Sequence, residues 1–541
     1  MTSMTGGEAI VSGLVAHGVS TVFGLPGAQI YGLFDAFHQA QLKVIGARHE
    51  QACGYMAYGY ARSSGKPGVF SVVPGPGVLN AGAALLTAFG SNEPVLCLTG
   101  QVPTQFLGKG RGHLHEMPDQ LATLRTFVKW ADRIEYPDNA LTAVSRAFQE
   151  MMSGRRGPAA LEMPWDVFTQ RVQASAARPF DPFPAPKADS ERIKDAAALI
   201  AASKAPMIFV GSGAIEAQED ILELAEMIDA PVVAFRSGRG IVSNAHELGL
   251  TMAAAYKLWP TTDLMIGIGT RLELPTMSRW PYRPDGLKSI RIDIDPVEMR
   301  RMPPDLAVVA DAKAATSDLV KAVAKSGTRK IAGRRAAIRE ATAAAQAEIQ
   351  RVQPQMAYLN ILRDVLPHDG IVTDELSQVG FASWYGFPIY APRTFITSGY
   401  QGTLGSGFPT ALGAKVANPD RPVVAITGDG GFMFAVQELA TAVQFNIGVV
   451  TLVFNNNAYG NVRRDQVQRF DGRVVASDLV NPDFVKLAES FGVAASRVTA
   501  PDHFRPALEK ALAHGGPYLI AIEVPKDSET TPWTFIHPAR P

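Results

Sequence analysis

The sequence predicts an α/β protein of three domains, each built on a doubly wound parallel sheet. Its 541 residues correspond to three or four domains at roughly 150 residues per domain. Within each third, short β-branched runs alternate with longer amphipathic segments, which is typical of βα units. Hydrophobic residues make up 47% and charged residues 19%, enough apolar material for large cores.

The expected strands all lead into a turn or a helical segment. They are 68–73, 94–98, 158–162, 207–210, 231–235, 264–267, 289–294, 370–373, 423–427, 449–454 and 518–523. Two breaks separate them into domains. Residues 178–190 contain four prolines, which favour an extended linker, and 325–354 read as an exposed, Ala-rich connecting helix. We therefore expect domains at 1–178, 190–325 and 350–541.

Charge and cysteine content narrow the class of partner. Lys plus Arg and Asp plus Glu both number 51, with no run of five like charges, so neither nucleic acid nor an anionic membrane is an expected partner. The two cysteines, Cys53 and Cys97, form neither a disulfide framework nor a metal cluster. No signal peptide or long apolar run is apparent, so we expect a cytoplasmic protein that binds small molecules.

Two strand ends in the last third carry the most specific local signal. The strand 423–427 leads into Gly428-Asp429-Gly430-Gly431, and the strand 449–454 leads into Asn455-Asn456-Asn457. Separately these fit a tight turn and an Asx-rich loop. Strand ends of one parallel sheet can face a common crevice, where a carboxylate and an amide oxygen suit Mg²⁺ and the glycines admit a diphosphate. Together they favour a metal and phosphate site.

The pairing of these motifs resembles the thiamine diphosphate (ThDP) enzymes of the acetohydroxyacid synthase, pyruvate oxidase, benzoylformate decarboxylase and benzaldehyde lyase group. Their motif is GDG, about two dozen residues, then NN. Similar segments run through the whole chain: VFGLPGA (22–28), ARHEQACGYMAYGYAR (47–62), VVPGPGVLNA (72–81), LTGQVPT (98–104), VGSGA (210–214), RIDIDP (291–296) and SGYQGTLGSGFPTALGAKVA (398–417). The resemblance implies an aminopyrimidine-binding domain at the N-terminus, a central domain with a degenerate nucleotide fold, and a C-terminal diphosphate and Mg²⁺ domain.

The resemblance assigns roles residue by residue. Asp429, Asn456 and the main-chain carbonyl of Ala458 are expected to hold Mg²⁺. Glu50 is expected to hydrogen-bond N1′ of the aminopyrimidine, so that the 4′-nitrogen can remove the C2 proton. Leu404 is expected to enforce the bent cofactor and the Gly402 carbonyl to accept from its 4′-amino group. The remaining expected cofactor contacts are Ser377, Gln378, Gly428, Gly430, Gly431, Tyr459 and Gly460.

Substrate choice is expected where this chain departs from its relatives. Asn461 and Asp465 stand where the synthases carry Met and Trp. Leu114-His115-Glu116 stands where they carry Phe-Gln-Glu, so His115 takes the place of the glutamine, and the loop at His115 and Glu116 is expected to steer the second step. A histidine near C2 suggests proton handling, although His113 and His115 also fit a solvated Gly-rich loop. Gln29 stands where benzaldehyde lyase has histidine. Glu375 resembles an acid of benzoylformate and oxalyl-CoA decarboxylases.

FAD is not expected. Arg271 and the turn Gly211-Ser212-Gly213 persist, but GTRLELPTMSRW (269–280) and ELGLTMAAAY (247–256) lack the flavin-site runs of the synthases.

We expect an acetolactate synthase-like decarboxylase or carboligase that acts on a 2-oxo acid, in a homodimer or homotetramer with active sites between chains. Three alternatives stay open: acyloin cleavage as in benzaldehyde lyase, a catalytically silent relative that serves as a binding subunit, and a flavin or nicotinamide oxidoreductase. The last would need a Rossmann fingerprint that the chain lacks. The segment 530–541 either folds over the site or forms a tail.

Overall fold

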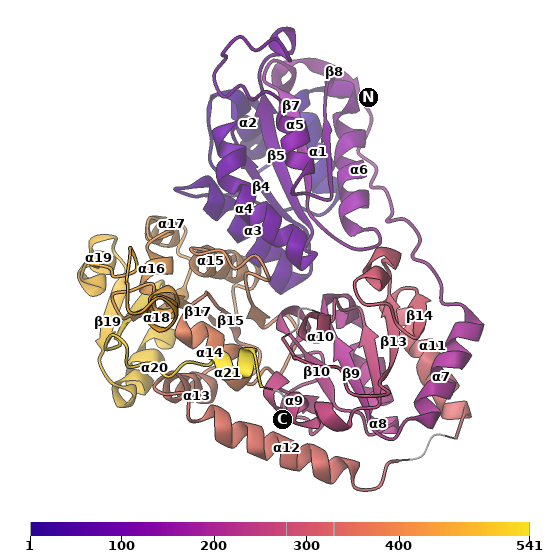
Figure 1. The fold of residues 1–541 in the computed structure, drawn as a ribbon. Helices are drawn as coiled ribbons and strands as arrows, with labels where there is room; N and C mark the ends of the chain where they lie inside the picture. Colours follow the sequence, from indigo (N-terminus) through magenta and orange to yellow (C-terminus); the bar gives the residue numbers. More distant parts are fainter. Residues whose placement is uncertain (1, 277–278, 328–329, 540–541) are drawn as a thin grey trace.

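The computed structural model describes residues 2–276, 279–327 and 330–539. Within these residues, three six-stranded parallel sheets lie along the chain, each flanked by helices (Figure 1). The N-terminal unit lies above the other two in this view, and the central and C-terminal units lie beside each other below it. The α/β class with three doubly wound parallel sheets is confirmed.

The first sheet has the order β3-β2-β4-β5-β7-β6. Its strands are β2 Thr21–Gly24, β3 Lys43–Gly46, β4 Gly68–Val72, β5 Val95–Gln101, β6 Trp130–Arg133 and β7 Ala159–Pro164, with helices α1 Gly6–Ala16, α2 Tyr31–Gln39, α3 Glu50–Ser64, α4 Pro76–Ser91, α5 Gln120–Arg125 and α6 Ala140–Met152. A short antiparallel pair, β1 Thr2–Thr5 and β8 Arg171–Ala174, ties the start of the unit to its end. β4, β5 and β7 are buried along their whole length, as expected for strands covered by helices on both faces.

The second sheet has the order β11-β10-β9-β12-β13-β14, which is the strand order of dinucleotide-binding domains. Its strands are β9 Pro206–Val210, β10 Val232–Ala234, β11 Gly249–Leu250, β12 Leu264–Ile268, β13 Lys288–Asp293 and β14 Leu306–Val309, with helices α7 Ser190–Ala202, α8 Gln218–Met227, α9 Met252–Leu258, α10 Glu273–Thr276 and α11 Ala312–Lys325. The order reverses between β9 and β12, so a ligand site is expected at that point.

The third sheet, β16-β15-β17-β18-β20-β19, repeats the strand order of the first. Its strands are β15 Ile371–Thr373, β16 Phe395–Ile396, β17 Val423–Gly428, β18 Val449–Asn455, β19 Ala494–Val498 and β20 Tyr518–Glu523. Its helices are α13 Gln355–Val365, α14 Gln378–Gly386, α15 Gly407–Ala417, α16 Asp429–Phe432, α17 Glu438–Gln444, α18 Gly460–Arg469, α19 Phe484–Ser490, α20 Phe504–His514 and α21 Trp533–Ile536. The switch point here lies between β15 and β17, the strands that precede Asp374 and Asp429.

Helix α12 (Arg334–Ile349) connects the second and third sheets along the lower edge of the molecule (Figure 1). Our expectation of a connecting helix is confirmed, but the helix is not fully exposed. Ile338, Ala345 and Ile349 are buried in the core that the two units share, and Lys257 of α9 pairs with Glu348 at 2.7 Å. Because its apolar residues recur at helical spacing, α12 packs one face against the core.

Two glycines let the N-terminal and C-terminal units approach closely. A Cβ on Gly59 of α3 would lie 2.0 Å from the Thr410 carbonyl oxygen of α15, and one on Gly413 would lie 1.9 Å from that of Met56. Any side chain at either position would collide with main chain. The contact fixes α3, which begins at Glu50, against α15, which follows the Gly402–Gly405 turn. No helix among the described residues is long and apolar enough to cross a membrane.

Candidate active site

The strand ends of β17 and β18 bring Asp429 and Asn456 together. Asp429 is the first residue of α16 and is 3% exposed. Its Oδ2 and the Oδ1 of Asn456 both accept from the Ala458 amide, at 3.3 and 3.1 Å. The two side chains therefore converge on one backbone position, as the sequence predicted. Carboxylate, amide and main-chain oxygens form a hard donor set that fits Mg²⁺.

Two residues that the sequence did not single out complete this cluster. Asn481 donates to Asp429 Oδ2 at 2.7 Å, and Glu529 accepts from Asn456 Nδ2 at 2.8 Å. Burial raises the pKa of Glu529 to about 7, and the neighbouring charge of Asp429 adds to the shift. Burial likewise raises the pKa of Asp429. A bound cation would favour the ionised forms of both acids, so the electrostatics of the cluster also fit a metal site.

Glycines and short contacts shape the floor of the same site. A Cβ on Gly430 would lie 2.5 Å from the Tyr459 ring, and one on Gly460 would lie 2.7 Å from Asn456 Nδ2. Ser377 Oγ accepts from the Gly380 amide at 3.0 Å, so its hydroxyl caps α14. The Oε1 of Gln378 is buried and has no hydrogen-bond partner among the residues that the structure describes. An unpartnered buried amide oxygen beside a glycine-rich turn is what a missing polar ligand leaves behind.

The turn from Gly402 to Gly405 is linked to the start of α16 through Glu375, which contacts both Gly405 and Gly431. Gly402 and Gly405 have φ of +59° and +80°, values that require glycine or impose strain. The Gly405 amide donates to Glu375 Oε1. Leu404 is half-buried, so it is not a leucine of the closed core. Its place on this turn suits a side chain that contacts a ligand.

The N-terminal unit holds a second group of predicted residues. Glu50 begins α3, and its carboxylate accepts from Asn80 Nδ2 at 3.0 Å. The Oε1 of the buried Gln29 accepts from His115 Nδ1 at 2.7 Å, and its Nε2 donates to the Leu114 carbonyl. Gln29 and His115 thus form one polar pair, although 86 residues separate them.

The loop that carries His115 packs on the turn before α4. His115 has φ of +62°, and a Cβ on Gly75 would lie 2.5 Å from its carbonyl oxygen. Glu116 Oε2 accepts from the His113 amide at 2.9 Å, and this hydrogen bond lowers the pKa of Glu116. His113 lies against the Phe106 ring with centroids 3.8 Å apart. The loop is therefore an ordered structure held by its own side chains.

The two groups are separate within one chain. In the parts of the chain that the structure describes, no hydrogen bond or ion pair joins Gln29, Glu50 or His115 to the cluster at Asp429. The N-terminus of α3 instead contacts α17, where Glu438 accepts from the Arg48 amide at 3.0 Å.

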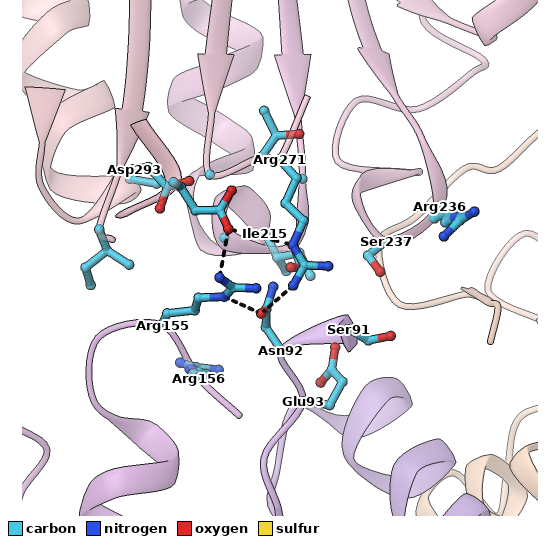
Figure 2. Close-up of a pocket in the computed structure, with 18 of the residues that line it drawn as sticks. Ser91, Asn92, Glu93, Arg155, Arg156, Ile215, Arg236, Ser237, Arg271 and Asp293 are labelled. Carbon is cyan, nitrogen blue, oxygen red and sulfur yellow. Dashed lines mark hydrogen bonds and ion pairs between the residues drawn. The ribbon is translucent and has the colours of Figure 1, made fainter. Parts of the chain in front are cut away.

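A cavity between the first and second units lies at the carboxyl ends of β9, β12 and β13 (Figure 2). Gly211, Gly269 and Asp293 line it from the central unit, and burial raises the pKa of Asp293 to about 6. Arg155 of the first unit donates to Glu298 of the second unit at 2.7 Å and to Asn92 of its own unit at 2.7 Å. The glycine turns and the acid resemble a dinucleotide site, but an internal ion-pair network spans it.

The comparisons with known proteins agree with this architecture. Three descriptions of the thiamine pyrophosphate enzyme family match in order: the N-terminal TPP binding domain over residues 4–123, the central domain over 193–319, and the C-terminal TPP binding domain over 376–522. The chain therefore belongs to the thiamine pyrophosphate enzymes. These are ThDP-dependent decarboxylases and carboligases, and ThDP is the cofactor of this chain.

Individual relatives place it near the acetolactate synthases. A probable acetolactate synthase large subunit of Methanocaldococcus jannaschii is 34% identical, over 96% of this chain and 92% of the relative. A probable 2-ketoarginine decarboxylase of Pseudomonas aeruginosa is 32% identical, over 96% and 94%. Acetolactate synthase isozyme 1 large subunit of Escherichia coli is 30% identical, over 98% and 95%. The expected membership of the acetohydroxyacid synthase group is thereby confirmed.

Proposed function

We propose that this chain is a ThDP- and Mg²⁺-dependent enzyme that decarboxylates a 2-oxo acid and then releases an aldehyde or joins the acyl unit to a second carbonyl compound. The observation that carries the proposal is the convergence of Asp429 and Asn456 on the Ala458 amide. Asp429 follows β17 at the switch point of the sheet and Asn456 follows the neighbouring β18, and the carboxyl ends of such strands are where ligands bind in doubly wound sheets. Asp429, Asn456 and the Ala458 carbonyl would hold Mg²⁺ against the cofactor diphosphate.

The cofactor supplies a carbon nucleophile and an electron sink when bound. The residues of the chain would orient the cofactor and exchange protons with it and with the substrate. Glu50 would hold the aminopyrimidine N1′ by a hydrogen bond, Leu404 would support the bent conformation, and the Gly402 carbonyl would accept from the 4′-amino group. Ser377, Gln378, Gly428, Gly430, Gly431, Tyr459 and Gly460 would complete the diphosphate site.

The polar pair Gln29 and His115 would face the substrate. Their 2.7 Å contact fixes the imidazole so that its other ring nitrogen can exchange a proton with the substrate or product. We place Glu116 beside them as the residue that keeps the loop in shape. A proton donor at this point would favour release of an aldehyde over ligation.

We further propose that two chains complete each site, in a homodimer or homotetramer. Exposed apolar side chains border both half-sites: Leu79 beside Asn80, and Met433 and Phe434 after α16. Covering such a surface would bury apolar area in an isologous interface. The domains would be 1–178, 190–325 and 350–541, and the unpaired, buried cysteines Cys53 and Cys97 support a cytoplasmic location.

We propose that the central cavity holds no tightly bound FAD. Arg155, Asn92, Arg271 and Glu298 fill its middle with their own hydrogen bonds and ion pairs, which a flavin nucleotide would have to replace. The purified protein should be colourless. Its absorbance at about 450 nm should lie far below the value expected for one bound flavin per chain. A stoichiometric flavin spectrum would contradict this proposal.

The deciding experiment is CO₂ release with product identification, from aliphatic, aromatic and basic 2-oxo acids with ThDP and Mg²⁺. The Glu50→Gln variant should bind ThDP nearly as the wild type does but lose C2 hydrogen–deuterium exchange and turnover by about 10²-fold or more, because general acid–base groups contribute at this level. Unchanged exchange would remove Glu50 from the mechanism. A wild-type protein that holds ThDP but releases no CO₂ from any substrate would instead support acyloin cleavage or a silent relative.

A further inference from the structure

One buried acid in the cofactor-binding unit has no role in the mechanism above. Glu375 follows β15 and is 2% exposed. Burial, together with the neighbouring Asp374, raises the pKa of Glu375 to about 8. A carboxyl group buried to this extent needs hydrogen bonds to offset its lost hydration. The groups that contact Glu375 therefore indicate its role.

The carboxyl group of Glu375 touches three segments at once. Glu375 lies two residues after β15, and its Oε1 accepts from the amide of Gly405, whose φ is +80°. A Cβ on Gly431 would lie 2.5 Å from Glu375 Cδ and Oε1 and 2.7 Å from Oε2. A Cβ on Gly407 would lie 3.1 Å from Glu375 Cβ. Glycine at these positions gives the acid its space.

The second oxygen of the same carboxyl group has no partner. Glu375 Oε2 is buried and makes no hydrogen bond among the described residues, while the neighbouring Gln378 Oε1 is in the same state. A buried polar atom without a partner destabilises the site unless a ligand hydrogen-bonds to it. Two such atoms on either side of the Ser377 cap mark this space as one that a polar ligand enters.

We propose that Glu375 is a positioning residue of the cofactor site: it holds the Gly402–Gly405 turn in its left-handed conformation through the Gly405 amide and presents its second oxygen to the space that the bound cofactor completes. This inference rests on the proposed function, because that function gives the turn its task of orienting the cofactor. Leu404 and the Gly402 carbonyl both lie in the turn, so fixing Gly405 fixes both.

The test compares Glu375→Gln with Glu375→Ala. Glutamine keeps the volume and an oxygen that accepts from Gly405, whereas alanine removes both. ThDP affinity is measured by calorimetry with Mg²⁺, and C2 hydrogen–deuterium exchange is measured by NMR after acid quench. The alanine variant should lose about tenfold in affinity and about tenfold in exchange rate, and the glutamine variant should stay within about threefold of wild type.

Asp229→Ala is the matched control. Asp229 is also 2% exposed and binds Arg335 at 2.6 Å, but it lies in the central unit away from the turn. It should lower thermal stability and leave ThDP affinity and exchange unchanged. If Glu375→Ala does not fold, Glu375→Leu fills the same volume without an acceptor and should show the same losses.

Each other outcome overturns the inference. Wild-type affinity and exchange in Glu375→Ala would show that the turn does not depend on the acid. An equal loss in Glu375→Gln would show that the acid itself, not its contact with Gly405, is required. Wild-type protein that neither binds ThDP nor exchanges C2 hydrogen would overturn the proposed function and this inference with it, so the two failures are distinguishable.

Discussion

Asp429 follows β17, begins α16 and lies near the residues that follow β18. Its replacement should weaken binding at the proposed Mg²⁺ site. In Asp429→Ala the Ala458 amide and Asn481 Nδ2 each lose one of two acceptors, and the proposed Mg²⁺ site loses its carboxylate. We expect Mg²⁺-dependent ThDP retention to fall by about tenfold or more, measured by calorimetry over a Mg²⁺ titration.

Asp483→Ala is a suitable control for that variant. Asp483 caps α19 through the Val485 and Lys486 amides, so its loss should cost about 1 kcal/mol of helix stability without touching the metal. Normal Mg²⁺-dependent retention in Asp429→Ala would refute the metal assignment.

Two adjacent buried acids should make stability depend on pH. Burial raises the pKa of Asp374 to about 7 and that of Glu375 to about 8, both above the values of the unfolded chain. At these two groups the folded state therefore binds more protons, so their contribution to stability is greatest at low pH and is lost as pH rises from about 5 to about 8. Arg236 and Arg239 oppose this by stabilising the ionised form of Asp374.

The expected result for the cofactor-free protein is an unfolding midpoint several degrees lower at pH 8.5 than at pH 5.5. Glu375→Gln removes one of the two titrations and should flatten the slope. A slope in the variant equal to that of wild type would mean that Glu375 does not titrate in this window.

The sequence could predict those site residues that follow a strand directly. Asp429 and Asn456 each come at the end of a long apolar run, so their approach follows from the parallel sheet. Asn481, Glu529 and Asn80 were missed because each reaches the site from a loop or a helix whose position depends on tertiary packing. Glu375 was noticed only as a resemblance, since nothing in the sequence shows that Gly405 and Gly431 pack around it.

At the scale of elements, the C-terminal segment runs beside α18. Trp533 Nε1 donates to Asn461 Oδ1 at 2.6 Å, and Arg464 lies 5.3 Å from the Trp533 ring. Arg464 also donates to Thr531 Oγ1 at 2.6 Å. The segment therefore folds against the helix in which we expected substrate-determining residues, and it is not a free tail over its described length.

Trp533→Ala should loosen this contact and raise the KM for the 2-oxo acid by about tenfold, because a hydrogen bond and a cation–π contact are lost together. Trp533→Phe keeps an aromatic ring but not the indole N–H, so its KM should lie between those of Trp533→Ala and the wild type. Limited proteolysis should cut the alanine variant faster within 529–539. Equal KM and equal cleavage in all three proteins would show that the segment does not support α18.

Element prediction succeeded where strands are long and fully buried. Every expected strand is present, because runs such as 423–427 and 449–454 are covered on both faces. The edge strands and the inner strand β2 were missed: β16 and β11 have two residues each, too few for a pattern, β2 has only four, and β19 is largely half-buried. For α12 the composition suggested exposure, but its small residues allow close packing.

At the scale of the whole molecule, the separation of the two half-sites predicts complementation between inactive chains. If each site takes Glu50 from one chain and Asp429 from the other, a hybrid of Glu50→Gln and Asp429→Ala chains has one fully intact site and one doubly defective site. Random reassociation of equal amounts should restore roughly a quarter of wild-type turnover.

Each variant alone, taken through the same dissociation and reassociation, serves as the control and should stay inactive. No recovery in the mixture, with hybrids verified by mass spectrometry, would place Glu50 and Asp429 of the same chain in one site.

The first and third sheets share one strand order, so β4 corresponds to β17 and β2 to β15. After β4 the chain turns at Gly75 and begins α4, and after β17 it turns at Gly428 and begins α16. Such a match is what duplication of one ancestral gene would leave. In that history the two copies diverged, so that one now carries Asp429 and Asn456 at its strand ends and the other carries Glu50 at the start of α3.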